Sequence, residues 1–90
     1  MSMNGASVRI DGELLPALQE ALERLDSADG EVVLDFSSVR RIGPDALKGM
    51  EELASKAEEK GIRVVLAGMS VDVYKVLKLA KLASRFSFRN

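Results

Sequence analysis

The sequence predicts an α/β fold, in which a small, mostly parallel β-sheet is built from alternating strand–helix units and the helices pack mainly on one face. Two apolar runs, Val32–Phe36 and Ile62–Ala67, are nearly continuous and rich in β-branched residues. Such runs are typical of strands that are covered on both faces. A segment with apolar residues three and four positions apart follows each run, as in an amphipathic helix. Strands that alternate with helices pair in parallel through right-handed crossovers.

The N-terminal third predicts the first strand–helix unit. Val8 and Ile10 alternate in a short strand, Ser7–Ile10, and the next segment, Glu13–Asp26, has helical spacing. Its predicted inward stripe consists of Leu15, Leu18, Leu22 and Leu25. Pro16 stands near the helix start, where a missing N–H group costs nothing. The polar run 27–30 predicts the stop of this helix.

Two further helices and a short last strand complete the predicted fold. The second helix is expected over Pro44–Lys60, with Gly61 as its C-cap. Its inward residues are Leu47, Met50, Leu53, Ala54 and Ala57. The third helix is expected from Val71 to about Ala83, with Val73, Val76, Leu77 and Ala80 inward. In the tail, 84–90, the alternation of Phe86 and Phe88 indicates a last strand. We expect Leu18, Leu22, Leu34, Val65 and Leu77 to share one core.

Composition excludes several classes of function. The 90 residues suit one domain, 1–90, and 47% hydrophobic with 30% charged residues is typical of a globular chain. Without His or Cys there is no Ser-His-Asp or Cys-His constellation and no ordinary zinc site, so we expect no enzyme, no metal and no cofactor. A net charge of −1 gives no support to nucleic-acid binding. The absence of a long apolar run or a signal peptide favours the cytoplasm, with no membrane insertion.

The order of the motifs resembles the STAS domain family, the fold of bacterial anti-sigma-factor antagonists. In that family a strand ending in Leu-Asp and an apolar residue leads to a loop, Asp-Ser-Ser-Gly-Leu, that opens a helix. A later strand ends in Gly, an apolar residue and Ser, and the following helix ends in a Leu-rich turn and an aromatic residue. The matching pieces here are Val33–Phe36, Gly43–Leu47, Leu66–Ser70 and Leu77–Phe86. The likeness spans Val8 to Phe88 and implies a STAS-like fold and a protein–protein interaction module that acts in transcription regulation.

Two departures from the family pattern stand out. The family usually has an additional strand before the first one predicted here, and little chain remains to form it. The regulated serine of the family falls on Pro44, which has no hydroxyl, and the next position is Asp45. The resemblance therefore implies a degenerate phosphosite at these two residues. Asp45 could imitate a phosphate in part, because a carboxylate carries one negative charge and a phosphoserine about −1.5 to −2.

Each of these motifs also has a structural interpretation. Gly43-Pro44-Asp45 is a good helix N-terminus without any function. Asp35 is expected to bond backbone N–H groups of the following turn rather than to accept a phosphate. Ser37 and Ser38 are expected to be ordinary turn residues and are only weak alternative phosphosites. The lysines of the third helix, Lys75, Lys78 and Lys81, are most simply explained by solubility.

The predicted partner-binding surface gathers around the start of the second helix. It consists of Ser38, Arg40, Arg41, Gly43, Pro44, Asp45, Lys48, Glu52, Met69 and Ser70. The first hypothesis is a module resembling an anti-sigma-factor antagonist, whose partner is an anti-sigma-factor kinase. The alternative is a STAS subunit that serves the ATPase of an ABC-type transporter. A nucleotide-binding switch is the third, and it is disfavoured because Pro44 offers no N–H group and Asp45 repels phosphate.

Overall fold

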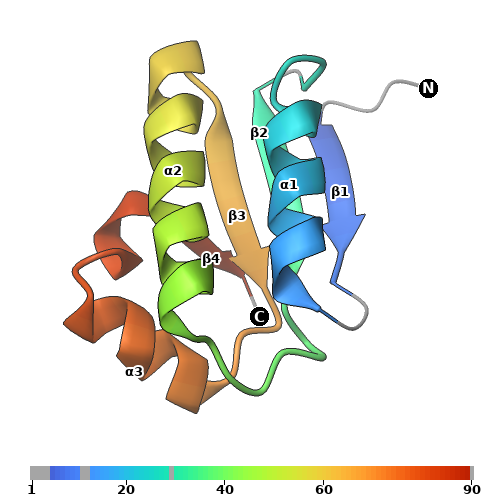
Figure 1. Cartoon of the computed structure of the whole chain (residues 1–90). Coiled ribbons are helices and arrows are strands. Elements are labelled where there is room, and N and C mark those ends of the chain that lie inside the picture. The colour runs from blue at the N-terminus through green and yellow to red at the C-terminus, as the bar shows by residue number, and fades with distance from the viewer. Residues whose placement is uncertain (1–4, 11–12, 29, 90) are drawn as a thin grey trace.

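The computed structural model, which describes residues 5–10, 13–28 and 30–89, is a parallel β-sheet with α-helices on one face. Four strands lie in the order β1-β2-β3-β4, and every neighbouring pair is parallel. The strands are β1 (Gly5–Arg9), β2 (Glu31–Asp35), β3 (Arg63–Ala67) and β4 (Ser87–Arg89). The helices are α1 (Leu14–Arg24), α2 (Pro44–Lys60) and α3 (Val71–Leu79). The predicted fold class is confirmed. Figure 1 shows α1 and α2 side by side on the same face of the sheet, with α3 near the start of α2.

The bounds of α2 agree with the prediction at both ends. Gly43 caps the helix in an extended conformation and Pro44 occupies its first turn. At the other end Gly61 adopts the left-handed conformation, with φ of 69°, and its N–H group bonds back to Glu58. Asp45 lies in the first turn and Lys60 in the last, so both charges complement the helix dipole.

The predicted stripe of α1 is displaced by part of a turn. Ala17, Leu18, Ala21 and Leu25 are buried, whereas Leu15 is 46% exposed and Leu22 is half-buried. Because the alanine side chains on the core face are small, α1 can lie close to its neighbours. At the α1–α2 contact, an added side-chain carbon on Gly49 would lie only 3.0 Å from Cδ1 of Leu18. The prediction was therefore wrong for Leu15, and Leu22 lies at the margin of the core rather than inside it.

The end of α3 also differs from the prediction. The helix stops at Leu79 because Lys81 takes a left-handed conformation, with φ of 64°, and the Leu82 N–H group bonds to the Leu77 carbonyl. A short 3₁₀ helix, η1 (Ala83–Arg85), follows and leads into β4. Val73 and Leu77 are buried as predicted, whereas Ala80 is exposed, because the helix has already ended there. The predicted last strand is confirmed as β4; Asn90 lies outside the described residues.

The two faces of the sheet are covered in different ways. The helix-facing residues Val8, Val32, Leu34 and Leu66 belong to the main core. Val65 points to the opposite face and lies outside that cluster, yet it is only 3% exposed. Arg89 and Glu31 form an ion pair of 3.4 Å, and the strand registers place Val65 midway between them. This pair therefore crosses the strand above Val65 and shields it. The apolar runs predicted that both faces of the sheet are covered. On the face of Val65 the cover consists of side chains rather than of a second layer of helices.

Candidate interaction site at the start of α2

The loop between β2 and α2 begins with a turn that Asp35 holds. Its Oδ1 accepts hydrogen bonds from the Ser37 backbone N–H group at 2.9 Å and from the Ser37 hydroxyl at 2.6 Å. The Val39 N–H group bonds to the Phe36 carbonyl and closes the turn. The interpretation of Asp35 as a turn-forming residue is confirmed. The Ser37 hydroxyl is engaged in the same arrangement.

The loop after β3 packs directly against this turn. Gly68 has a φ of +68°, and a side-chain carbon added there would lie 3.0 Å from Cβ and 3.3 Å from Cα of Ser37. Only glycine combines this backbone conformation with so close an approach. Two residues later, the Ser70 hydroxyl accepts a hydrogen bond of 3.2 Å from the Val73 N–H group and caps α3. The two loops are therefore held in a fixed relation at the carboxyl ends of the two central strands, β2 and β3.

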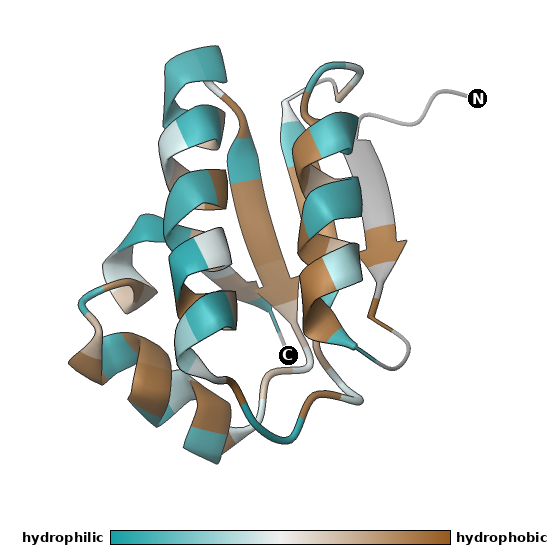
Figure 2. Ribbon diagram, viewed as in Figure 1, coloured by the Kyte–Doolittle hydropathy of each residue, from teal (hydrophilic) through white to brown (hydrophobic). Residues whose placement is uncertain are grey.

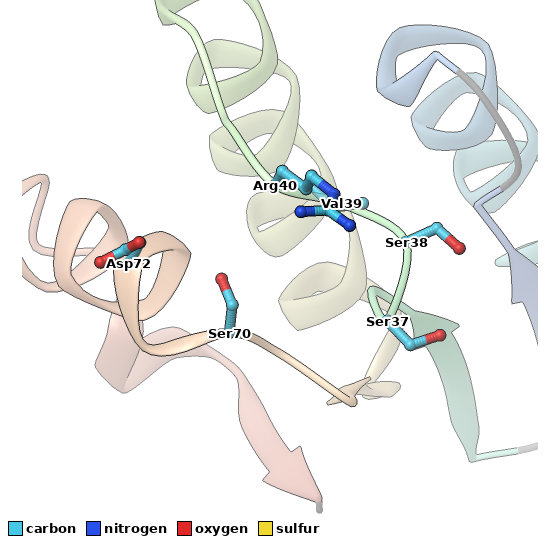
Figure 3. A pocket seen from close by; sticks show the side chains of 6 residues that line it. All are labelled: Ser37, Ser38, Val39, Arg40, Ser70 and Asp72. Atoms are coloured by element: carbon cyan, nitrogen blue, oxygen red, sulfur yellow. The ribbon is translucent and has the colours of Figure 1, made fainter.

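A shallow hollow lies between the two loops, and its polar groups do not converge. Its lining is Ser37, Ser38, Val39, Arg40, Ser70 and Asp72. In Figure 3 the Ser70 hydroxyl points toward the segment that carries Arg40. The hydroxyls of Ser37 and Ser38 point away from Ser70, to the other side of the loop (Figure 3). The Asp72 carboxylate lies farther along α3 (Figure 3). Such a hollow suits contact with a protein surface better than enclosure of a small ligand.

The degenerate phosphosite that the family resemblance implies lies on another side of the loop, against α1. Gly43, Pro44 and Asp45 are exposed and line a second hollow together with Glu13 and Leu15. Glu52 lies about two turns farther along α2 than Asp45 and lines an adjoining hollow that also includes Leu15. The exposed Leu15 is thus shared by both hollows. It provides an apolar contact next to the polar start of α2.

The structure distributes the predicted surface over three neighbouring regions. Ser38, Arg40 and Ser70 line the hollow between the loops, and Gly43, Pro44, Asp45 and Glu52 face α1. Met69 is half-buried against the core and lines a further hollow beside α3. Arg41 and Lys48 are exposed and line none of the hollows described here.

Three residues at these hollows were missed by the sequence analysis. Leu15 was assigned to the core because it fits a leucine stripe, and only the packing of the alanines reveals that it is exposed. Asp72 was not considered, although an acidic residue two positions after the cap of a helix is a recognisable signal. Ser37 was named only as a weak phosphosite. Its contact with Gly68 depends on two loops that are distant in sequence.

Shifted acid–base groups lie away from the start of α2. A hydrogen bond from Arg85 holds the pKa of the Glu58 carboxyl below its ordinary value, and one from Lys60 does the same for Asp26. Both pairs lie on the surface, toward the far end of α2. Within the described ranges, no group of three or more His, Cys, Asp or Glu side chains is placed to hold a metal ion.

Comparison with known proteins decides the family. A family model described as "Mlab, STAS domain" matches residues 1–86. The chain belongs to the STAS domain family. The NMR structure of the protein TM1081 is similar in fold, with a TM-score of 0.80 at 16% sequence identity, and the alignment covers 98% of this chain and 75% of that one. No curated protein matches the sequence.

Membership of this family supports a general conclusion about activity. STAS domains are generally non-catalytic interaction modules, so a protein partner is the expected kind of ligand. In the part of the chain that the structure describes, no helix is long and apolar enough to cross a membrane.

Proposed function

We propose that this STAS domain is a non-catalytic interaction module, resembling an anti-sigma-factor antagonist, that binds its partner without a phosphorylation switch at the usual loop position. The binding region is the α2-start surface, defined as the ten residues of the predicted set. The observation that carries the proposal is the exposed first turn of α2, where Pro44 and Asp45 stand in place of hydroxyl residues. A partner that docks there meets the same surface at all times.

The neighbouring hydroxyls support the absence of a switch. The Ser37 hydroxyl donates to Asp35, and the Ser70 hydroxyl accepts the capping bond of α3. Phosphate on Ser37 would remove the bond that its hydroxyl donates and would place negative charge against Asp35. Phosphate on Ser70 would still accept the Val73 N–H group at the start of α3. Ser38, which is exposed in the turn, and Ser70 are therefore the remaining candidates near the loop. We therefore expect mass spectrometry to find no phosphate on residues 43–47 after incubation with ATP and the kinase of a STAS system. Phosphate on Ser38 or Ser70 would show that the switch has moved.

The charges of the surface define the partner it suits. Arg40 and Arg41 are exposed beside Asp45, and Lys48 and Glu52 follow on α2. The hollows around the apolar side chain of Leu15 are lined by the acidic residues Glu13, Asp45 and Glu52, whereas Arg40 lies on the side of the loop that faces α3. Such a pattern favours a protein partner with complementary charges, because charge complementarity sets orientation and association rate. It disfavours a nucleotide, since Pro44 has no N–H group to offer a phosphate.

A second candidate shares the same surface. A STAS subunit that serves a transporter ATPase can remain bound permanently and needs no release step. A first turn without a hydroxyl, as at Pro44 and Asp45, suits such a subunit as well. Binding measured against both an anti-sigma-factor kinase and a transporter ATPase, each taken from the genes that neighbour this one, distinguishes the two candidates.

The experiment that tests the α2-start surface compares two lysines on one helix. Lys48 and Lys56 are both exposed on α2, but Lys56 lies eight residues, or about 12 Å, farther along it. We expect Lys48→Glu to weaken partner binding about tenfold or more in titration calorimetry, and Lys56→Glu to change it little. Equal effects of the two substitutions would place the partner elsewhere.

A further inference from the structure

The C-terminal part of the fold carries an exposed aromatic pair between two shallow hollows. Tyr74 of α3 and Phe88 of β4 are each 39% exposed, and their rings meet edge to face with centroids 5.2 Å apart. Both rings line one hollow with Lys78, Lys81 and Ala83. They also line a second hollow together with Met69, Ser70, Val71 and Arg89, and this second hollow adjoins the α2-start surface. The contact of the two rings brings α3 and β4 together although η1 separates them in the chain. In Figure 2 hydrophobic and hydrophilic bands alternate along α3.

Charge is distributed very unevenly between this region and the rest of the chain. Residues 71–89 contain five Lys and Arg against one Asp, whereas residues 1–70 contain eight Lys and Arg against thirteen Asp and Glu. The net charge of −1 therefore conceals a basic C-terminal region of +4 and a remainder of −5. A charge patch of one sign beside exposed apolar side chains is a feature of interaction surfaces.

The lysines at the first hollow and the nearby arginines differ in their partners among the described residues. Arg85 bonds to Glu58 and Ser55 of α2, and Arg89 bonds to Glu31. Among the described residues, neither Lys78 nor Lys81 forms an ion pair. The arginines thus stabilise the fold, and the two lysines remain available to an external carboxylate.

The backbone at Lys81 is a second and independent indication. Its φ of 64° lies in the left-handed region, at the position after a helix where glycine is the usual residue. Gly30, Gly61 and Gly68 occupy the other described positions of positive φ. A lysine in this conformation makes the fold less stable than a glycine would. Residues with strained backbone conformations cluster at functional sites. Here the conformation places Lys81 at the rim of the hollow.

We propose that this surface, the α3–β4 surface (Tyr74, Lys78, Lys81, Ala83 and Phe88), is a second docking site, which shares no residue with the α2-start surface and adjoins it at Met69 and Ser70. Its occupant is a protein segment that presents an apolar side chain flanked by carboxylates. The apolar side chain enters the hollow beside the aromatic pair, and the carboxylates pair with Lys78 and Lys81. The site would let the domain hold two protein segments at once, one at each surface.

The shape of the surface favours a protein segment over the other acidic ligands. A lipid bilayer would take up the protruding side chains of Val71 and Leu79 on α3, which are 68% and 84% exposed, but it would leave the hollows beside the two aromatic rings unfilled. A second copy of the chain would bring its acidic α1–α2 side to the basic surface of the first. That contact is head to tail and does not close into a dimer. A segment from a different protein has neither difficulty.

The test uses a synthetic helical peptide with leucines on one face and glutamates along both edges of that face. A matched peptide has glutamine in place of each glutamate. We expect the acidic peptide, but not the glutamine peptide, to shift the backbone NMR signals of Tyr74, Lys78, Lys81 and Phe88. The double variant with Lys78→Glu and Lys81→Glu should weaken binding about tenfold or more.

Lys75 supplies the matched control, because it is exposed on the same helix but lines neither hollow. Lys75→Glu should weaken peptide binding by less than about twofold. A comparable loss with Lys75→Glu would mean diffuse charge attraction and would overturn the proposal. So would the absence of peptide binding, or binding to phosphatidylglycerol vesicles in its place. Concentration-dependent shifts of the same signals in the protein alone would assign the surface to a second copy and also overturn it.

Discussion

At the scale of single residues, Gly68 links the two loops that form the candidate site. Its positive φ and its contact with Ser37 both exclude a side chain. We expect Gly68→Ala to lower the free energy of unfolding by about 2–4 kcal/mol, because backbone strain of about 1–2 kcal/mol adds to a steric clash that the neighbouring backbone cannot avoid. Urea unfolding measures the loss.

Gly61→Ala provides the control for the strain alone. Gly61 has nearly the same φ, 69°, but nothing lies within 4 Å of an added side-chain carbon. Its loss should be limited to about 1–2 kcal/mol. If the two variants lost equal stability, the contact between Gly68 and Ser37 would have no energetic weight, and the fixed relation of the two loops would be in doubt.

At the scale of the elements, local signals determined how well each helix was predicted. The bounds of α2 followed from a proline at one end and a glycine at the other, which act within one turn of the helix. The end of α3 could not be found in this way, because its left-handed residue is Lys81, a type that carries no such signal. The outward position of Leu15 depends on contacts between α1 and α2, which a spacing pattern does not contain.

Two leucines of α1 test the corrected packing of that helix. Leu18 is 2% exposed, whereas Leu22 packs against the core but is half-buried. Leu18→Ala should lower the free energy of unfolding by about 2–5 kcal/mol, and Leu22→Ala by roughly half of that, since the cost grows with the cavity left behind. Denaturant titrations of both variants compare them. An equal or larger loss at Leu22 would contradict the placement of the helix.

The ion pair between α2 and η1 predicts a dependence of stability on pH. Arg85 keeps the pKa of Glu58 below its ordinary value of 4.5 in the folded state, so its stabilisation is present above that pH and disappears as the pH falls through the folded pKa. Glu58→Gln should therefore be less stable than the native chain at pH 7, with the difference shrinking progressively below pH 4.5. Urea unfolding across this range measures it. Glu59→Gln, in the neighbouring exposed position, should show no such convergence.

At the scale of the whole molecule, strand–helix alternation was enough to predict that the sheet is parallel and in which order strands and helices follow along the chain. The order of the strands within the sheet was not predicted and comes from the structure. The candidate site was less predictable. Loop residues that adjoin in sequence were expected to form one surface, but Gly43–Asp45 faces α1 while Arg40 faces α3. The turn of the chain between them separates the two groups, and only the packing of both helices against the loop determines this.

The charge of Asp45 has either a regulatory or a structural role, and Asp45→Ser tells the two apart. If Asp45 imitates the phosphorylated and released state of an antagonist, Asp45→Ser should strengthen partner binding, because it removes a charge that the partner surface is built to reject. If Asp45 only supports the dipole of α2, the same change should cost about 0.3–1 kcal/mol of stability or less and leave the affinity unchanged. Calorimetric titration of the native chain and of the serine variant against the partner, with unfolding curves for each, distinguishes the two roles. The exposed position of Asp45 in a well-formed first turn, with Gly43 and Pro44 before it, favours the structural role. Tighter binding by the serine variant would contradict that expectation and show that the domain is held in a released state by its own sequence.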